Sequence, residues 1–252
     1  MQLRLKFSTF ALVVWLMASG MAHAPAPDAV GTISFVLGKN EEVTVLRRES
    51  TKWLPAQLKM PVLQGDQIQT AAESRCEIKL TDGSVIRIGE KSLFDFEQSK
   101  LAQSNRQVDG TLKSGSIWAN IFKLKWGREK FEIKSPTAVC AVRGTIYRMD
   151  ADSTTRVAVY DGQVDIGPAS GLRQRLQQQS RPVGPPTQVP GPTEIPGPYE
   201  VSLDQWVRLV AGFQIEIREN GRYAKSSIDP NREAGVDWIQ WNLQRDREIQ
   251  RQ

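Results

Sequence analysis

The sequence predicts an all-β protein built from short strands. Between Val30 and Ile166, apolar residues alternate with polar ones, as they do in strands that bury one face. Turn-forming residues recur about every ten residues, a spacing typical of β-sandwiches and rolls. Two Asp-Gly pairs, Asp82-Gly83 and Asp161-Gly162, stand between alternating runs and indicate tight turns. We therefore expect a short-strand β-sandwich or a β-helix-like roll, completed by a small hairpin and a terminal helix.

The N-terminal part of this region supplies the first predicted strands. Val30–Glu49 alternates around a turn at Gly38-Lys39-Asn40, and the loop that follows ends at Pro61. Gly65-Asp66 then forms a turn before a short strand that contains Ile68.

Each Asp-Gly turn allows a register to be chosen, because only some loop lengths keep one face of a hairpin apolar. A three-residue loop, Asp82-Gly83-Ser84, is favoured at the first turn and a two-residue loop at the second. The cross-strand pairs expected from these loops are Leu80 with Ile86, Ile78 with Ile88, Val159 with Val164, and Val157 with Ile166. Similar strings precede the two turns and hint at an internal repeat, but two copies do not establish a solenoid.

The most apolar stretch begins at Phe131, in a strand that Pro136 should end because proline has no N–H for the ladder. Arg143-Gly144-Thr145 interrupts the next apolar run, and Gly144 predicts a bulge or a close approach of two backbones. A charge at Arg143 needs either a partner or access to solvent. We favour an internal ion pair or carbonyl contacts for this side chain, and contact with a partner protein is the alternative.

Five short motifs, in this order along the chain, resemble those of the FecR domain, the periplasmic module of the ferric-citrate-type regulators. They are Gly65–Thr70, Leu80–Ser84, Ser135–Ala138, Val142–Thr145 and Val159–Val164. The likeness covers the region from Val30 to Ile166. It implies a compact fold of stacked short strands that serves contact with other proteins. The motif residues to which it gives a structural or partner-contact role are Pro136, Arg143, Gly144, Thr145, Asp161 and Gly162.

The family's regulators carry a cytoplasmic segment that holds a sigma factor, and then a membrane span, ahead of this domain. Only six residues precede the apolar run that begins at Phe7, so we do not expect the sigma-factor role. Met1–Ala22 instead resembles a secretory signal, in which Arg4 and Lys6 precede a short apolar core and small residues end it. We expect a periplasmic or secreted mature protein that begins near His23; an uncleaved anchor is the alternative.

Residues 167–198 differ in composition from the region before them. Glutamine is frequent up to Arg181, and beyond it nearly every second or third residue is proline. Such a segment is expected to be an extended, semi-rigid linker. The chain then divides into a signal peptide (1–22), a FecR-like β-domain (30–166), this linker (167–198) and a C-terminal unit (199–252).

The C-terminal unit is predicted to contain a hairpin and a helix. Trp206–Val210 and Phe213–Ile217 have the pattern of strands, and Asn220-Gly221 that of a turn leading to a weak return strand. A helix should begin at Asp229-Pro230, since aspartate caps helices and proline suits their first turn.

Few residues of the predicted mature chain suit catalysis. His23, the only histidine, lies at the expected cleavage site, and the sequence has no phosphate loop, serine elbow or Cys-x-x-Cys motif. Acidic residues such as Asp150 and Asp152 are numerous, but turn geometry accounts for most of them. We expect a protein that is not an enzyme and that holds no metal or cofactor.

Cys76 and Cys140 are the two cysteines of the sequence. Both share the parity of inward-facing residues, so either a disulfide or a pair of buried thiols fits the pattern. The FecR resemblance favours free thiols, because its pattern has no cysteine pair at these positions.

These observations together favour a protein-binding module of the cell envelope, which partners reach by adding a strand to an edge. The alternative is binding of polysaccharide or peptidoglycan through tryptophans, namely Trp118, Trp126, Trp238 and Trp241. The last two suit the docking of a helix better. Nucleic acid is not expected. The basic residues Lys123, Lys125, Arg128 and Lys130 alternate with apolar ones, as on a solvated strand face.

Overall fold

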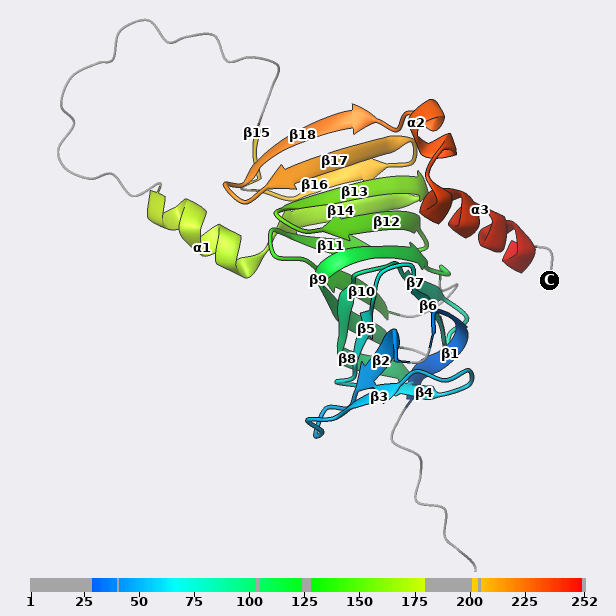
Figure 1. The fold of residues 1–252 in the computed structure, drawn as a ribbon. Helices are drawn as coiled ribbons and strands as arrows, with labels where there is room; N and C mark the ends of the chain where they lie inside the picture. Colours follow the sequence, from blue (N-terminus) through cyan, green and yellow to red (C-terminus); the bar gives the residue numbers. More distant parts are fainter. Residues whose placement is uncertain are drawn as a thin grey trace, which may run out of the picture.

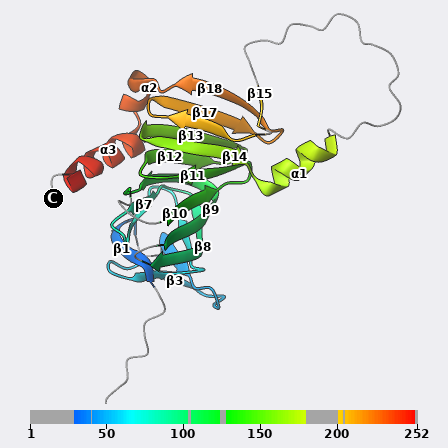
Figure 2. The ribbon, with the colours of Figure 1, turned by 180° about the vertical axis from the view of Figure 1, so that it is seen from behind.

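The computed structural model describes residues 29–39, 41–102, 105–123, 128–179, 201–203 and 205–250. These residues form 18 strands and three helices, so the fold is all-β, as the sequence predicts. The helices α1 and α3 lie on opposite sides of the strands in both views (Figures 1 and 2). The predicted signal peptide falls outside the described residues, as does the proline-rich run.

The strands belong to two sheets that share the long strand β9 (Asn105–Asn120). Sheet A contains, in spatial order, β4 (Pro61–Leu63), β1 (Ala29–Leu37), β6 (Arg75–Leu80), β7 (Val85–Ile88), β9, β12 (Ile146–Ala151), β13 (Thr154–Asp161), β17 (Phe213–Arg218), β18 (Arg222–Ser227) and β15 (Val201–Ser202). Sheet B contains β3 (Trp53–Pro55), β2 (Val43–Leu46), β5 (Gln67–Thr70), β8 (Leu93–Ala102), β9, β10 (Arg128–Lys134), β11 (Ala138–Val142), β14 (Gln163–Pro168) and β16 (Val207–Val210). Strands β9 and β10 run parallel to each other, and the other neighbouring strands in these two orders are antiparallel.

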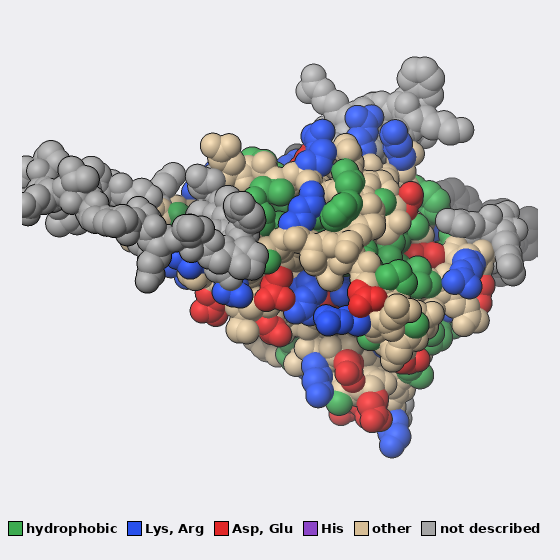
Figure 3. All heavy atoms as spheres, turned by 90° about the horizontal axis from the view of Figure 1, so that it is seen from above, with side chains coloured by type: hydrophobic (Ala, Val, Ile, Leu, Met, Phe, Trp, Pro, Cys, Tyr) green, Lys and Arg blue, Asp and Glu red, His purple; other side chains and the backbone are tan. Residues whose placement is uncertain are grey.

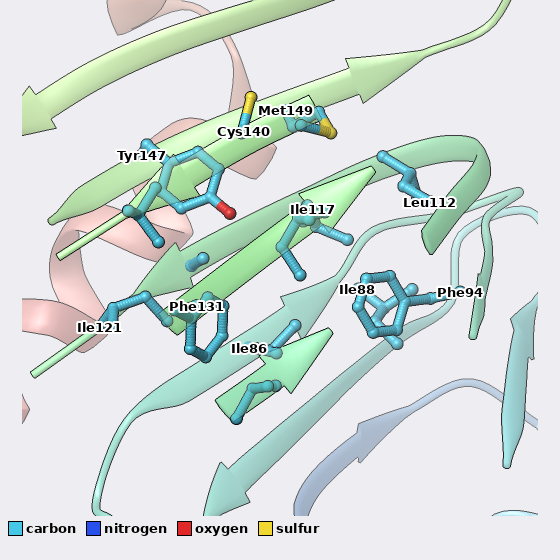
Figure 4. Packing of buried hydrophobic residues seen from close by; sticks show 14 of the residues in the cluster. Ile86, Ile88, Phe94, Leu112, Ile117, Ile121, Phe131, Cys140, Tyr147 and Met149 are labelled. Carbon is cyan, nitrogen blue, oxygen red and sulfur yellow. The ribbon is translucent and has the colours of Figure 1, made fainter. Parts of the chain in front are cut away.

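Alternate residues of both sheets meet in one apolar core. Ile117 and Tyr147 from sheet A and Phe131 and Cys140 from sheet B belong to the same cluster of buried side chains (Figure 4). Burial of a large apolar side chain stabilises a fold by roughly 1.5–3 kcal/mol. This shared core therefore holds the two sheets face to face, as in a sandwich.

The turn at Asp161-Gly162 differs from the predicted hairpin. β13 pairs with β12 and β17 in sheet A, whereas β14 pairs with β11 and β16 in sheet B. The chain therefore crosses from one sheet to the other at Gly162, and the expected pairing of Val159 with Val164 is wrong. Buried valines give the same alternation whether they share one face of a sheet or face each other across a core.

The hairpin at Asp82-Gly83 exists, but its register differs by two residues from the predicted one. The observed pairs are Ile78 with Ile86 and Cys76 with Ile88. The loop is Thr81-Asp82-Gly83, and across it the Leu80 N–H donates to the Ser84 carbonyl (2.8 Å). The Asp82 carboxylate accepts from the Ser84 N–H (2.9 Å), which favours this position of the three-residue loop. A shift of two residues preserves the apolar face, so alternation alone does not distinguish the registers.

The first part of the predicted linker is ordered structure instead. β14 extends to Pro168, and α1 follows at Ser170–Gln179. Leu172 is buried, and Leu176 lies four residues further on the same helix face. Two leucines among polar residues make too weak a pattern to reveal the helix. Residues 180–200 lie outside the described residues.

The C-terminal strands continue both sheets. β16 pairs with β14, and β17 pairs with β13, while the side chains of Leu209 and Ile215 belong to the shared core. The predicted hairpin with a turn at Asn220-Gly221 joins β17 to β18. Asp229 caps a short helix, α2 (Pro230–Ala234), as predicted, and a separate helix, α3 (Asp237–Gln250), follows it. The division of the chain into folding units stays a prediction.

Candidate functional site

The FecR-like motif residues gather where the chain crosses twice between the sheets. Residues 143–145 connect β11 to β12, and residues 161–162 lie between β13 and β14. Gly144 and Gly162 have φ angles of 62° and 78°, which glycine adopts without strain. A Cβ at Gly162 would lie 2.7 Å from the Gly144 carbonyl oxygen, so the two crossings approach closely. The Thr145 hydroxyl joins them by donating to the Gln163 carbonyl (2.7 Å).

The turn at Ser135-Pro136-Thr137 joins the two sheets through buried hydrogen bonds. Ser135 Oγ and Thr137 Oγ1 lie 2.8 and 2.6 Å from Thr155 Oγ1 of β13, and all three residues are buried. Pro136 is exposed at the end of the strand, where its missing N–H leaves no ladder bond unmade. The polar groups of this motif thus satisfy one another.

Arg143 is exposed, so the internal ion pair predicted for its charge is wrong, and the predicted carbonyl contacts stay a prediction. The chain leaves sheet B at this residue, and the alternation of β11, in which Val142 is buried, places the side chain of Arg143 on the outer side. Arg143 instead lines a groove of about 200 Å³ on the outer face of sheet B. This position is compatible with the alternative, contact with a partner.

Two adjoining grooves lie on this outer face. The first contains Arg143 together with Lys130, Ala141, Gln163 and Asp165. The second, of about 420 Å³, is lined by Ala141, Asp165, Trp206 and Arg208. Because Ala141 and Asp165 line both, the two form one shallow depression, which we name the sheet-B groove. Asp165 and Arg208 are cross-strand partners, and Arg208 Nε donates to Asp165 Oδ1 (2.7 Å).

Trp206 exposes 51% of its surface at the side of this groove, although aromatic side chains of this size are mostly buried. Its ring lies against Gly167 of β14, where a Cβ would come within 2.8 Å of the indole. The ring is thus supported on one face and open on the other. The sequence places Trp206 at the start of a strand but gives no signal of its exposure, because the supporting glycine is distant in sequence.

The strand that follows Trp206 is an edge strand in the described part of the chain. β16 pairs with β14 on one side, and no strand pairing among the described residues occupies its other side. Along β16, Leu209 is buried, whereas Arg208 and Val210 are exposed. An edge of this kind can accept a further strand from another chain.

The outer face of sheet A is covered in part by α3, through a buried polar network. Arg87 of β7 is 0% exposed. Its Nε lies 2.7 Å from Glu77 Oε2 and its Nη1 2.7 Å from Asp246 Oδ1 of α3. Asp246 also accepts from Trp118 Nε1 (2.8 Å) and Asn120 Nδ2 (3.0 Å). Charge pairs and hydrogen bonds, as well as apolar contacts, therefore attach α3 to the sheet.

Glu77 stands at the centre of this network. Burial by itself would raise the pKa of Glu77, but hydrogen bonds from Arg245 and Arg87 outweigh it and lower the pKa to about 2. Arg87 Nη2 is buried without a hydrogen-bond partner. The Arg87 guanidinium carbon lies 5.8 Å from the centroid of the Trp241 ring, and this cation–π contact offsets part of that cost.

The tryptophans considered for glycan binding make contacts within the protein. Trp118 is fully buried and stacks on a tyrosine ring of β13 at 4.3 Å between centroids, so it offers no surface to a sugar. Trp238 and Trp241 stack on each other (5.6 Å), and Trp241 packs against Phe35 of β1 (5.5 Å). Both therefore take part in docking α3. Trp126 lies outside the described residues.

The basic residues interpreted as one strand face are separated in the structure. Lys130 lies on β10, 3.1 Å from Glu132 and 3.5 Å from Asp109. Lys123 belongs to the loop after β9. The side chains of Lys125 and Arg128 are outside the described residues. At Lys130, acidic neighbours balance the basic charge.

Cys76 and Cys140 are buried free thiols, one in each sheet. Burial raises the pKa of Cys76 to about 12 and raises that of Cys140 as well, which disfavours reactive thiolates. Among the described residues, no group of three or more His, Cys, Asp and Glu could hold a metal ion. None of the helices in the described ranges has the length and apolar character of a membrane span.

Comparisons with known proteins point to one family. The family described as FecR protein matches residues 66–165. No curated protein is significantly similar to the chain in sequence. Two crystal structures, at 1.65 and 2.50 Å, of a candidate anti-sigma factor from Parabacteroides distasonis align with a TM-score of 0.44 and 16% sequence identity. The alignment covers 65% of this chain and 60% of that protein.

Proposed function

Because residues 66–165 of this chain form a FecR domain, we propose that the protein is a non-catalytic module of the cell envelope that senses a signal or acts as a scaffold. It does so by binding an envelope protein through the sheet-B groove and the open edge of β16. One observation carries this proposal: a tryptophan with 51% of its surface exposed lies against a glycine, beside a strand whose second edge is unpaired in the described chain.

The residue types in the groove support a protein partner. Tryptophan and arginine dominate the binding energy of protein interfaces, and an anchor that is fixed beforehand loses little conformational entropy on binding. Trp206 directly precedes β16 and Arg208 belongs to it, and the backbone of this strand can pair with an added strand. An extended segment would thus gain main-chain hydrogen bonds from the edge and a side-chain contact from the indole.

Charge indicates which segment fits. The ionisable residues that line the sheet-B groove are three cations, Lys130, Arg143 and Arg208, and one carboxylate, Asp165. Glu132 and Asp109 balance Lys130, so the remaining excess is one positive charge. A partner segment with acidic side chains complements this excess and is steered toward it. We therefore propose an acidic, extended segment as the bound element.

The export of the protein and the lack of catalysis are parts of the same proposal. Export rests on the pattern of Met1–Ala22. The non-catalytic role rests on the FecR domain and on a chain whose single histidine precedes the folded region. Polysaccharide or peptidoglycan is the second candidate ligand, and an exposed indole beside Asp165 and Arg208 is the observation that favours it.

The experiment places a photo-crosslinking residue at position 210 of the full chain, an exposed position of β16, and irradiates intact cells. We expect one crosslinked envelope protein, and we expect Trp206→Ala to reduce the yield at least about tenfold, as for a central anchor. The matched control is Phe213→Ala, because Phe213 is also a partly exposed aromatic residue but lies on sheet A. Equal crosslinking by the wild type and Trp206→Ala would contradict the proposal.

A glycan array probed with the same three proteins separates the two candidate ligands. Saturable binding of the wild type to a glycan, lost in Trp206→Ala and kept in Phe213→Ala, would show that the sheet-B groove binds a glycan and not a protein. Signals that are equal for all three proteins would leave the protein partner as the ligand of the groove.

A further inference from the structure

A second concave site lies on the outer face of sheet A, beside α2. The cleft has a volume of about 550 Å³, between β12, β13, β17 and β18 on one side and the α2–α3 segment on the other. Sites for small ligands commonly occupy roughly 300–1,000 Å³. The proposed protein contact uses the other sheet, so this cleft has no role in it.

The ionisable residues that line the cleft balance in charge. They are Arg148, Arg156, Arg232, Glu216, Asp229 and Glu233. Seen from above, basic and acidic side chains are interspersed over this side of the molecule, with no large patch of one sign among the described residues (Figure 3). A cleft of this kind has no net attraction for a simple anion or a simple cation.

Arg148 is the buried member of this set, at 8% exposed. Its Nε lies 3.1 Å from Asp150 Oδ2 and its Nη1 3.4 Å from Glu233 Oε1. Despite these close charges, Nε has no hydrogen-bond partner, because the Asp150 oxygen is near but not aligned. Tyr160 already donates to the same Glu233 oxygen (2.8 Å). Nε itself is enclosed, but Arg148 lines the cleft, where its guanidinium group can receive a ligand carboxylate.

The carboxylates at the mouth of the cleft have spare acceptor capacity. Glu216 accepts from Arg156 (2.8 Å), and Asp229 lies 3.5 Å from Arg232. Both carboxylates are partly exposed, and each carboxylate can accept about four hydrogen bonds. An ammonium group with three donors suits this position. Ile239, which is buried, and Val236 add an apolar wall.

We propose that this cleft binds a small zwitterion, namely an amino acid or a short peptide with free ends. Its carboxylate lies at Arg148 and Arg156, and its ammonium group at Glu216 and Asp229. A ligand that carries both charges in one molecule suits the balanced cleft, because each charge lies beside a residue of opposite charge and the net charge of the site does not change.

Isothermal titration of the full chain tests this proposal, with the dipeptide alanyl-alanine as the probe. We expect saturable binding of the free dipeptide and none of N-acetyl-alanyl-alanine amide, which has the same shape without the charges. Ammonium acetate at equal concentration supplies the same charges unlinked and should not bind.

Two variants locate the site. Arg156→Gln should weaken dipeptide binding at least about tenfold, the loss expected for one charge-assisted contact. The control is Lys134→Gln, because Lys134 forms a comparably exposed ion pair with Glu97 (2.6 Å) on sheet B; it should bind the dipeptide as the wild type does. Equal binding of the capped dipeptide, equal loss in both variants, or no binding of alanyl-alanine would overturn the proposal. Crosslinking at position 210 is independent of these results, so either proposal can fail alone.

Discussion

The outer faces of the two sheets carry charged residues at alternating positions, but they differ in what lies on them. On sheet A, Arg87 and Glu77 are buried beneath α3 and joined to Asp246. On sheet B, Arg208 and Asp165 form an ion pair of equal length that remains open to solvent. The same chemistry thus holds a helix in place on one face and is available to a partner on the other.

This difference separates stability from recognition. An exposed ion pair contributes about 0–1 kcal/mol, whereas removing one partner of a buried pair leaves an uncompensated charge and costs about 3–5 kcal/mol. Substitutions beneath α3 should therefore change folding, and substitutions in the sheet-B groove should change binding. Matched variants on the two faces can measure this separation, from the largest expected effect to the smallest.

The largest effect is expected for Asp246→Ala. This change removes the carboxylate that accepts from buried donors on Arg87, Trp118 and Asn120 and leaves the Arg87 cation with one carboxylate fewer, so the free energy of unfolding should fall by about 3–5 kcal/mol. Asp165→Ala is the matched control, with an expected loss below about 1 kcal/mol. Urea denaturation of both variants measures the difference, and similar losses would show that burial does not distinguish the faces.

The second prediction concerns acid. Glu77 has its pKa lowered from 4.5 to about 2 by hydrogen bonds that outweigh its burial. A lowered pKa in the folded state stabilises the protein fully above pH 4.5, and this stabilisation is lost as pH falls toward 2. Its size is on the order of 3 kcal/mol. The wild type should therefore lose stability between about pH 4.5 and pH 2 more steeply than Glu77→Gln does; parallel profiles in urea titrations would refute the assignment.

The sequence revealed the strands better than it revealed their connections. Ile78–Gly83 and Val157–Gly162 are similar strings, yet the first ends in a hairpin within sheet A and the second in a crossing to sheet B. Alternation records which side chains are buried and not which sheet buries them. β14 lies in sheet B because it pairs with β11 and β16. Neither partner is its neighbour in sequence, and a long segment separates β16 from β14.

The candidate sites were less predictable than the fold, for a related reason. Arg87 has the pattern of a solvent-facing strand residue, and a helix that begins 150 residues later (237 − 87) buries it. Trp206 also has the pattern of a strand residue, but its ring lies against Gly167 and half of its surface stays exposed. Both outcomes depend on contacts between distant segments, which no local pattern records. Asn220-Gly221 and Asp229-Pro230 were predicted correctly because their geometry is local.

The third prediction tests whether the crossings keep the two faces in place. Gly162→Ala puts a side chain at φ 78°, 2.7 Å from the Gly144 carbonyl oxygen, and should cost about 2–3 kcal/mol, since the backbone must shift. Gly83→Ala has a similar φ of 89°, but its nearest contact is the Phe122 ring at 3.5 Å. This control should cost about 1 kcal/mol. Denaturation that shows equal costs would mean that the two turns carry equal strain.

The smallest effect on stability is expected for Arg143→Ala, although the residue lies between two apolar strands. Its side chain is exposed where the chain leaves sheet B, so the free energy of unfolding should change by less than about 0.5 kcal/mol. The same substitution at Arg87 removes a fully buried cation from between Glu77 and Asp246 and should cost several times more. Arg143 lines the sheet-B groove, and losing its charge should slow capture of an acidic segment. Thermal melting and the crosslinking yield at position 210, measured on the same variant, separate the two effects. A lowered melting temperature with unchanged crosslinking would make Arg143 a support of the crossing beside Gly144 and remove it from the binding surface.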